Sequence, residues 1–190
     1  QAEANGVKEL SEGGIAPAAY QKEWQTIFTE GVRPSKALGA ACTLKFPFIE
    51  DYPAKRERTL TDGTRGYNDF SYNWLCFDGT SMECVIDLGN EKDIHSIEIN
   101  FLQDQRHWIF PPKSVTVSSS GDGNTYQAVK NITAPALKED YDVKRVPFTF
   151  PANTKTRYIK VTAQNYSTLP DWRFHKTKKP IIACDEVWVD

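Results

Sequence analysis

The segment between residues 60 and 74, LTDGTRGYNDFSYNW, combines acids, hydroxyls and aromatic rings but has no hydrophobic period. Within it, Asp62-Gly63-Thr64 places a carboxylate and a hydroxyl on either side of a glycine that permits a tight turn. A turn of this kind can direct carboxylate, hydroxyl and backbone oxygens towards one hard cation. The spacing of an EF-hand is absent, and Asp-Gly is also a common turn dipeptide. The residues alone therefore leave two alternatives open, a cation site or a simple turn.

Two further segments gather aromatic and basic side chains next to expected strands. They are QDQRHWIFPP, residues 103–112, and LPDWRFHKTKKP, residues 169–180. Aromatic faces bind the C–H surfaces of sugars, and branched or planar donors reach the hydroxyls. The two segments predict a ligand site on loops, although their tryptophans could instead plug the ends of a β-fold. The candidate ligand-binding residues are Arg106, His107, Trp108, Trp172, Arg173 and His175.

The elements that hold these loops are predicted by alternation of apolar and polar residues. Period-two patterns occur at 84–88, 97–101, 115–118, 148–150, 159–163 and 187–189. Turn signals stand between them, among them Gly89-Asn90, the GDGN segment at 121–124 and the PAN segment at 151–153. About eight short strands without intervening helices predict an all-β fold, an antiparallel β-sandwich or jelly roll.

Residues 1–35 have a different character. The first fifteen are polar, and Tyr20, Trp24, Ile27 and Phe28 then recur on one face of a helix expected over 17–30. The apolar stripe either packs on the β-domain or on a neighbouring domain. We therefore divide the chain into a linker with an amphipathic helix, 1–35, and a β-sandwich domain, 36–190.

Composition limits the functions that the chain can have. With 190 residues, 39% of them hydrophobic, it is long enough for one globular domain. The net charge of −2 gives no electrostatic footprint for nucleic acid, and no apolar run is long enough for a transmembrane helix. No common catalytic motif is present, so no enzymatic activity is expected of this chain alone. Because it starts at Gln1 without methionine, we expect a processed product or a fragment of a larger protein.

The four cysteines are Cys42, Cys76, Cys84 and Cys184, and none forms a C-x-x-C pair. A zinc ribbon or a thioredoxin-type site is therefore not expected. Two alternatives remain: four buried thiols, or a clasp between Cys42 and Cys184 on paired terminal strands.

Several of these stretches together resemble a known family. In order, LTDGTRGYNDFSYNW, CVIDLG, FPPKSVTVSSSGDGNTY, RYIKVTAQN and DEVWVD resemble the discoidin-like, coagulation-factor type C domains, from about Leu38 to Asp190. The resemblance implies a galactose-binding-like jelly roll. The ending LPDWRFH…ACDEVWVD is similar to modules at the C-terminus of bacterial hexosaminidases and related glycan-degrading enzymes.

The resemblance also implies a structural calcium ion. Carried onto this chain, its ligands would be the side chains of Asp62 and Glu186, with backbone or hydroxyl oxygen from Leu60 and Thr64. The loop is longer than in the shortest family members, which adds Asn68 and Asp69 as further candidates for the metal-binding set.

For function, the resemblance implies ligand binding by loops that correspond to 65–75, 103–111 and 169–178. We expect a non-catalytic carbohydrate-binding module of a secreted, periplasmic or cell-surface bacterial protein, with a glycan as ligand and an adjoining glycoside hydrolase domain as partner. The alternative is a structural or protein-docking module of the same fold without a sugar site.

Overall fold

The computed structural model describes residues 33–190, so the helix predicted over 17–30 lies outside the described residues. The described chain consists of seven strands and three short 3-10 helices. In chain order these are β1 (Ala41–Leu44), η1 (Arg56–Thr61), β2 (Leu75–Asp78), β3 (Met82–Gln103), η2 (Gln105–His107), β4 (Ser114–Ser120), β5 (Gln127–Thr133), β6 (Lys144–Gln164), η3 (Asp171–Arg173) and β7 (Ile181–Val189). The predicted all-β class is confirmed.

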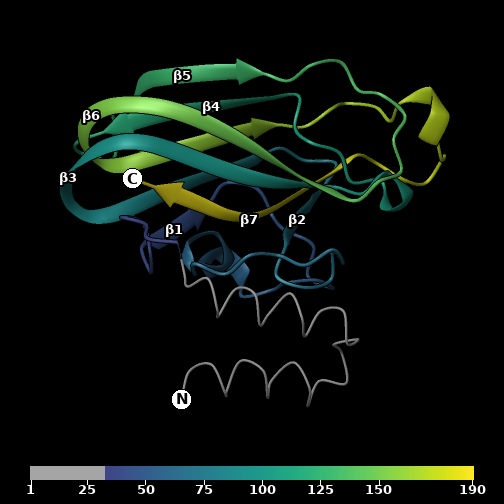
Figure 1. Cartoon of the computed structure of the whole chain (residues 1–190), viewed down its shortest axis with the longest axis horizontal. Coiled ribbons are helices and arrows are strands. Elements are labelled where there is room, and N and C mark those ends of the chain that lie inside the picture. Colours follow the sequence, from purple (N-terminus) through teal and green to yellow (C-terminus); the bar gives the residue numbers. More distant parts are fainter. Residues whose placement is uncertain (1–32) are drawn as a thin grey trace, which may run out of the picture.

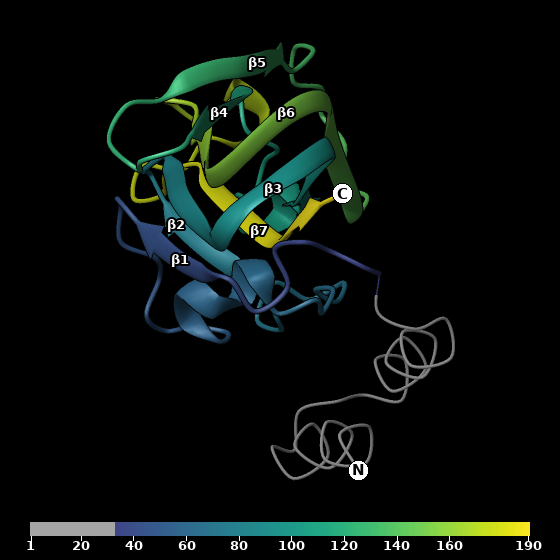
Figure 2. The same ribbon diagram turned by 90° about the vertical axis from the view of Figure 1, so that its left-hand side faces the viewer.

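All seven strands belong to one antiparallel sheet that is folded into two layers, the arrangement of a jelly-roll sandwich. One layer orders β2, β7, residues 96–103 of β3 and residues 144–151 of β6. The other orders β1, residues 82–87 of β3, residues 158–164 of β6, then β4 and β5. The long strands β3 and β6 bend together from one layer into the other at the left of Figure 1. In Figure 2 this bend faces the viewer.

The main core lies between the two layers. Ile86 and Val161 reach it from one layer, Ile99 and Phe150 from the other, and all four are buried. Alternation along each strand places these side chains on the inner face and their polar neighbours on the outer face. The burial of apolar surface is therefore what holds the two layers together.

Two of the predicted turns lie inside long strands. Patterns at 84–88 and 97–101 belong to the same strand, β3, although Gly89-Asn90 predicted a turn between them. The pairing with β6 instead changes register between Asp87 and Lys92, and Gly89 adopts a φ of 87° there. Likewise the segment 151–153 lies inside β6. Glycine and proline therefore mark the bend of the sandwich, because a bulge needs the same backbone freedom as a turn.

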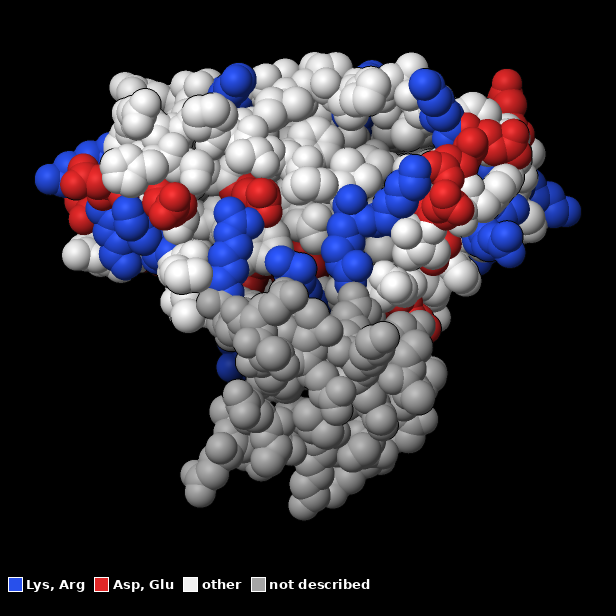
Figure 3. Space-filling model, viewed as in Figure 1, with Lys and Arg blue, Asp and Glu red and all other residues white. Residues whose placement is uncertain are grey.

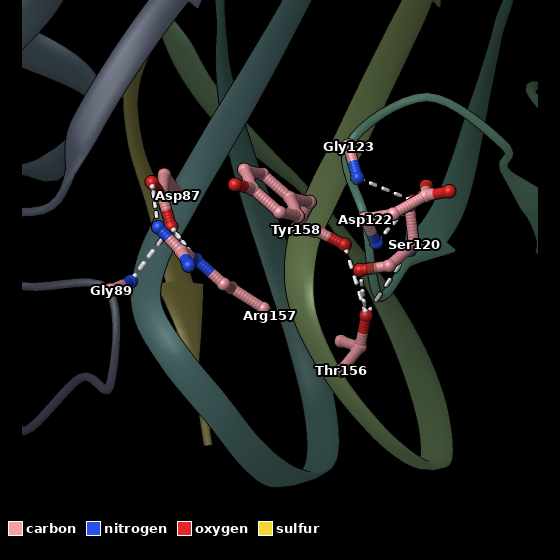
Figure 4. A network of polar contacts seen from close by, with 8 residues as sticks. All are labelled: Asp87, Gly89, Ser120, Asp122, Gly123, Thr156, Arg157 and Tyr158. Carbon is pink, nitrogen blue, oxygen red and sulfur yellow. Dashed lines mark hydrogen bonds and ion pairs between the residues drawn. The ribbon is translucent and has the colours of Figure 1, made fainter.

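The tight turns at this bend are held by side chains close to them in the fold (Figure 4). Arg157 donates to both carboxylate oxygens of Asp87 at 2.8 and 3.0 Å. The buried hydroxyl of Thr156 accepts a hydrogen bond from the backbone N–H of Ser120 at 3.1 Å and donates to its carbonyl at 2.8 Å. Asp122 accepts bonds from two backbone N–H groups that follow it in the 121–125 turn. We call the end of the sandwich that contains residues 87–89, 120–125 and 156–158 the turn end.

The start of the described chain is tied to its end. The backbone N–H of Lys36 donates to the carbonyl of Val189 at 2.7 Å, and the N–H of Val189 donates to the hydroxyl of Ser35 at 3.0 Å. Residues 35 and 189 therefore lie side by side although 154 positions separate them.

The expected pairing of cysteine-bearing terminal strands is wrong. Cys42 is on β1 and Cys184 on β7, and each of these strands pairs with β3 but not with the other. All four cysteines are free thiols in the structure, three of them buried and Cys42 partly exposed. The apolar setting of these sites explains the burial, because a thiol packs as a small hydrophobe.

Candidate functional site

A cleft of about 410 Å³ is lined by residues of the 103–110 and 169–180 loops, of the 49–52 segment and of β2. These two loops lie at the end of the sandwich opposite the bend in Figure 1. The apolar floor of the cleft consists of Ile49, Cys76, Ile109 and Ile181, which pack with a small second core around the buried Trp74. A parallel bridge between Ile109 and Ile181 joins the 103–110 loop to the first residue of β7. The floor is therefore built by strand residues of β2 and β7, by the bridged Ile109 and by Ile49 from a loop.

One wall is formed by Phe70 with Tyr52 and His107. The ring of Phe70 meets Tyr52 edge-on at 5.0 Å between centroids and lies 4.7 Å from the imidazole of His107. The Nδ1 of His107 lies 2.7 Å from a carboxylate oxygen of the buried Asp104. That contact places the hydrogen on Nδ1 and leaves Nε2 as the acceptor of the neutral ring. The wall thus offers an aromatic surface and one oriented imidazole.

A second part of the cleft lining is formed by Trp108 and Lys178. The guanidinium of Arg173 lies 4.0 Å from the centre of a Trp108 ring, and the ammonium of Lys178 lies 4.9 Å from it. The indole N–H of Trp108 donates to the carbonyl of Arg173 at 3.2 Å, and His175 meets the indole edge-on at 5.8 Å. Because cations contact this indole, Trp108 is a fixed wall of the cleft more than an open stacking platform.

The remaining charged side chains of the cleft are Asp51, Asp78 and Lys179. Among residues 33–190, no ion pair engages any of these three, and none engages Lys178. Donors and acceptors without a partner in the protein can form hydrogen bonds to the hydroxyls of a ligand. The cleft therefore combines rings, an oriented imidazole and free polar groups.

The structure brings together the two predicted aromatic–basic loops, but only His107 and Trp108 of the six candidates line the cleft. Trp172 and Arg173 are half-buried and donate hydrogen bonds to the 103–110 loop. Arg106 and His175 are exposed. Sequence reasoning did not single out Tyr52, Phe70, Asp51, Asp78, Lys178 or Lys179 as site residues. Phe70 and the two lysines stood in stretches that were noted for aromatic or basic residues, and the other three did not.

A second polar site, the acidic pocket, lies where the 60–66 segment meets β7. Glu186 is buried, and neither of its carboxylate oxygens has a hydrogen-bond partner in the described chain. Asp62 caps its own turn by accepting a bond from the N–H of Thr64 at 2.8 Å. Its other oxygen lies 3.3 Å from the ammonium of Lys55, a side chain that is half exposed. Asp62 and Glu186, 124 positions apart in sequence, therefore meet at one pocket.

The charges in the acidic pocket repel each other. Burial, together with the nearby carboxylates of Asp62 and Asp185, raises the pKa of Glu186 to about 10. Burial also raises the pKa of Asp62, against the influence of the Thr64 N–H and of Lys55. An orphaned buried carboxylate costs free energy unless it is protonated or receives a positive charge. A proton on Glu186 or a bound cation would each relieve this cost.

Asp185 was not among the predicted residues but lies beside the same pocket. It is fully buried, accepts a bond from the N–H of Gly66 at 2.8 Å and is bonded by the amide of Asn100 at 3.0 Å. Burial raises its pKa to about 7. The acid of DEVWVD that precedes Glu186 thus anchors the 60–74 loop instead of facing solvent.

The other residues of the predicted metal-binding set are placed as follows. Leu60 is buried in the main core at the end of η1, so its contribution would be its backbone oxygen. The carbonyl of Thr64 accepts a bond from the side chain of Asn73 at 2.8 Å. Asn68 accepts a bond from Arg145, and Asp69 caps the N–H of Ser71. These contacts engage Asn68 with β6 and Asp69 with its own turn.

The residues present fit a hard cation only in combination with backbone oxygens. In residues 33–190, no three His, Cys, Asp or Glu side chains converge to form a metal site by themselves. Calcium binds six to eight oxygens and accepts backbone carbonyls freely, whereas zinc requires nitrogen or sulfur. The unpartnered oxygens of Glu186 beside Asp62 therefore match the oxygen chemistry of calcium.

The charged surface of the face in Figure 3 is mixed, with basic and acidic side chains interspersed. No helix in the described part of the chain has the length and apolarity needed to cross a membrane.

Comparison with known proteins agrees with the fold. The F5/8 type C domain model matches residues 50–175, more than half of the chain. The match defines the chain as a domain of this class, and the antiparallel jelly roll described above is its fold. The chain belongs to the F5/8 type C domain family. No curated protein sequence matches it significantly.

Solved structures share the fold at low sequence identity. The CBM32-4 module of a GH89 protein from Clostridium perfringens, in complex with GlcNAc-α-1,4-galactose, is 14% identical with a TM-score of 0.54, and the match covers 82% of this chain and 92% of that one. A fucose-binding module from Streptococcus pneumoniae is 11% identical with a TM-score of 0.51, covering 83% and 98%.

A GH29 fucosidase from Ruminococcus gnavus is 15% identical with a TM-score of 0.52 over 88% of this chain. This chain spans only 28% of the length of that enzyme. The neighbours therefore include both isolated carbohydrate-binding modules and a domain within a larger glycosidase.

Proposed function

We propose that the chain is a non-catalytic carbohydrate-binding module that binds a sugar in the cleft between Phe70 and Trp108. The observation that carries the proposal is the cleft itself, in which aromatic rings, the imidazole of His107 and unpaired polar groups converge. The structural neighbours that bind glycans support the proposal at the level of the fold. A small, shallow site removes little surface from water, so the dissociation constant should be about 0.1–1 mM.

The module would serve a larger glycan-degrading protein outside the cytoplasm of a bacterium. By holding a linked glycoside hydrolase domain near its glycan, even a weak site raises the effective concentration of substrate. The match to the GH29 fucosidase covers only 28% of that enzyme, which is compatible with a module attached to a catalytic domain. The proposal places the protein in the periplasm, on the cell surface or in the medium.

The acidic pocket would hold a structural calcium ion. The carboxylates of Asp62 and Glu186 would bind it, helped by oxygens of Leu60 and Thr64, and Lys55 would move away into solvent. The ion would satisfy the two orphaned oxygens of Glu186. It would also tie the 60–66 segment to β7, which stabilises the folded chain by closing a long loop.

The sugar proposal is tested by titrating the protein with L-fucose, D-galactose, N-acetylglucosamine and oligosaccharides that contain them, while following tryptophan fluorescence. His107→Ala removes an oriented donor or acceptor from the wall and should weaken binding about tenfold or more. Lys176→Ala is the matched control, because Lys176 is exposed and does not line the cleft. A wild-type protein that responds to no sugar, or a His107→Ala variant that binds as well as wild type, would contradict the proposal.

A docking role is the second candidate, and exposed apolar side chains favour it. Phe174 is 70% exposed, and Tyr141 and Val143 are also exposed on the neighbouring 134–143 segment. Aromatic residues beside arginines are common at the centre of protein interfaces. If the sugar titrations fail, cross-linking of the full-length protein should show Phe174 and Tyr141 in contact with an adjoining domain.

A further inference from the structure

Gln105 occupies an unusual position for a glutamine, because it is completely buried at the start of the short helix η2. Its side-chain amide donates to the carbonyl of Lys138 at 2.8 Å. Its side-chain oxygen accepts the indole N–H of Trp172 at 2.9 Å and the backbone N–H of Asp140 at 3.3 Å. One side chain therefore contacts both of the segments that flank the 103–110 loop.

The orientation of this amide is determined by its neighbours. Lys138 presents a carbonyl, which can only accept, whereas Trp172 and Asp140 present N–H groups, which can only donate. A flipped amide would set its NH₂ group against two donors and its oxygen against an acceptor. The site thus requires one donor and one acceptor in a fixed direction, which is a property that glutamine supplies and an apolar residue of the same length does not.

The backbone of Gln105 adds a third connection. Its carbonyl accepts a bond from the guanidinium of Arg173 at 2.9 Å, and Arg173 also donates to the carbonyl of Arg106 at 2.6 Å. The same guanidinium lies against the ring of Trp108, the wall of the cleft. A continuous set of contacts therefore runs from the buried amide to the cleft.

We infer that Gln105 is a positioning residue that locks the 134–143 and 169–178 segments against the 103–110 loop and so fixes the wall of the cleft before a ligand binds. We call this set of contacts around Gln105 the lock. The lock itself is independent of any ligand, whereas its effect on ligand affinity rests on the proposed sugar binding. A buried amide with all its polar groups paired is stable only in this one arrangement of the three segments, since a shift of any segment would leave a polar group unpaired. A pre-formed wall spares the ligand the entropy of ordering loops.

The lock is tested without ligand by hydrogen–deuterium exchange on wild type, Gln105→Met and Trp172→Phe. Methionine keeps the length and volume but cannot form the three side-chain bonds, so amides in both 134–143 and 169–178 should exchange about tenfold faster or more. Trp172→Phe removes only the bond to the 169–178 segment, so only that segment should exchange faster. Gln127→Met, on the exposed face of β5, is the control and should leave both segments unchanged.

The consequence for the cleft is tested with whichever of L-fucose, D-galactose or N-acetylglucosamine the wild type binds. Loss of the lock should raise the dissociation constant by about tenfold in Gln105→Met, because misplaced groups bind poorly, while His107→Ala acts without changing exchange in the two segments. Unchanged exchange in Gln105→Met would overturn the lock. Faster exchange with unchanged sugar affinity would overturn its positioning role.

The outcomes separate this inference from the proposed function. If no sugar binds wild type, the proposed function fails, and the exchange pattern alone supports or overturns the lock. If Gln105→Met does not fold, Trp172→Phe decides: faster exchange confined to 169–178 supports the lock, and unchanged exchange overturns it.

Discussion

The two ends of the sandwich hold their connecting segments in place in different ways. At the turn end, side chains of one strand bond directly to a neighbouring strand or turn, as Thr156 does to the backbone of Ser120 (Figure 4). At the cleft end, Gln105, Trp108 and Arg173 join longer connecting segments to one another. The turn end has its polar groups satisfied within itself. The cleft end leaves several polar groups for a ligand.

This difference explains why the cleft between Phe70 and Trp108 lies at the end with the longer segments. A turn of a few residues has no length with which to enclose a volume, and its polar atoms are used to hold its own backbone. Longer segments enclose space, but they need contacts between distant residues to stay in place. Substitutions at the turn end should therefore affect stability alone, whereas those on the cleft side should affect stability, ligand or metal in separable ways.

The largest effect is expected from calcium at the acidic pocket. Added at one hundred times its dissociation constant, the ion should stabilise the protein by about 2.7 kcal/mol, which raises the melting temperature by roughly 5–10 °C. Differential scanning calorimetry after chelation and after re-addition measures this. Glu186→Gln should abolish the response, and Glu57→Gln on η1 is a control that should keep it. A chelated protein that melts at the same temperature as the calcium-loaded one would remove the ion from the proposal.

A slightly smaller effect is expected at the turn end. Thr156→Val keeps the shape of the side chain but leaves the N–H and the carbonyl of Ser120 without their partner. Unpaired buried groups cost about 1–3 kcal/mol, so the melting temperature should fall by several degrees. Sugar titrations and the calcium response should match wild type. Any loss of sugar affinity in Thr156→Val would show that the two ends are not independent.

The fold was largely predictable from sequence, and the sites only in part. Alternation identified the halves of β3 and β6 because one face of each is buried, but it could not tell a bulge at Gly89 from a turn. Asp62 and Glu186 came from resemblance, since no local pattern links residues so far apart. No sequence pattern identified Asp51 and Asp78 as cleft residues. An acid beside a turn is usually a solvent-exposed surface residue, and only the fold shows that these two line a cleft.

The expectation that both tryptophans contact ligand stays a prediction, but the structure places the two rings differently. The indole N–H of Trp172 is bonded to buried Gln105, and Trp172 does not line the cleft. A sequence shows that an aromatic residue lies in a loop, but not whether its polar atom faces solvent or another loop. The role of Trp108 as a sugar contact stays a prediction that the titrations test.

A pH effect of about 1 kcal/mol or more is expected in the metal-free protein. Glu186 has a pKa of about 10 in the fold against 4.5 as the ordinary value, so the folded state holds the proton more tightly. Its contribution is full below pH 4.5 and is lost as the pH rises towards 10. Denaturant unfolding with chelator should therefore show a fall in stability above pH 4.5. Glu186→Gln should flatten this fall and melt higher than chelated wild type at neutral pH. A chelated wild type whose stability does not fall above pH 4.5 would mean that Glu186 is ionised in the metal-free fold.

The smallest effect is expected for Phe174→Ala. The side chain is 70% exposed and does not line the cleft, so the melting temperature should change by less than about 2 °C. Sugar affinity should also be unchanged in fluorescence titrations. If affinity is lost, the ligand sits at the tip of the 169–178 segment, and the cleft is not the site.

The bonds of Ser35 and Lys36 to Val189 have a mechanical consequence. A force that pulls residues 35 and 189 apart would load these two bonds first and would reach the ladders of the sandwich only after they part. The loops that line the cleft lie at the end of the domain away from the C-terminus in Figure 1. Tension between residues 35 and 189 would therefore be carried at one pole, while the loops at the opposite pole keep their shape.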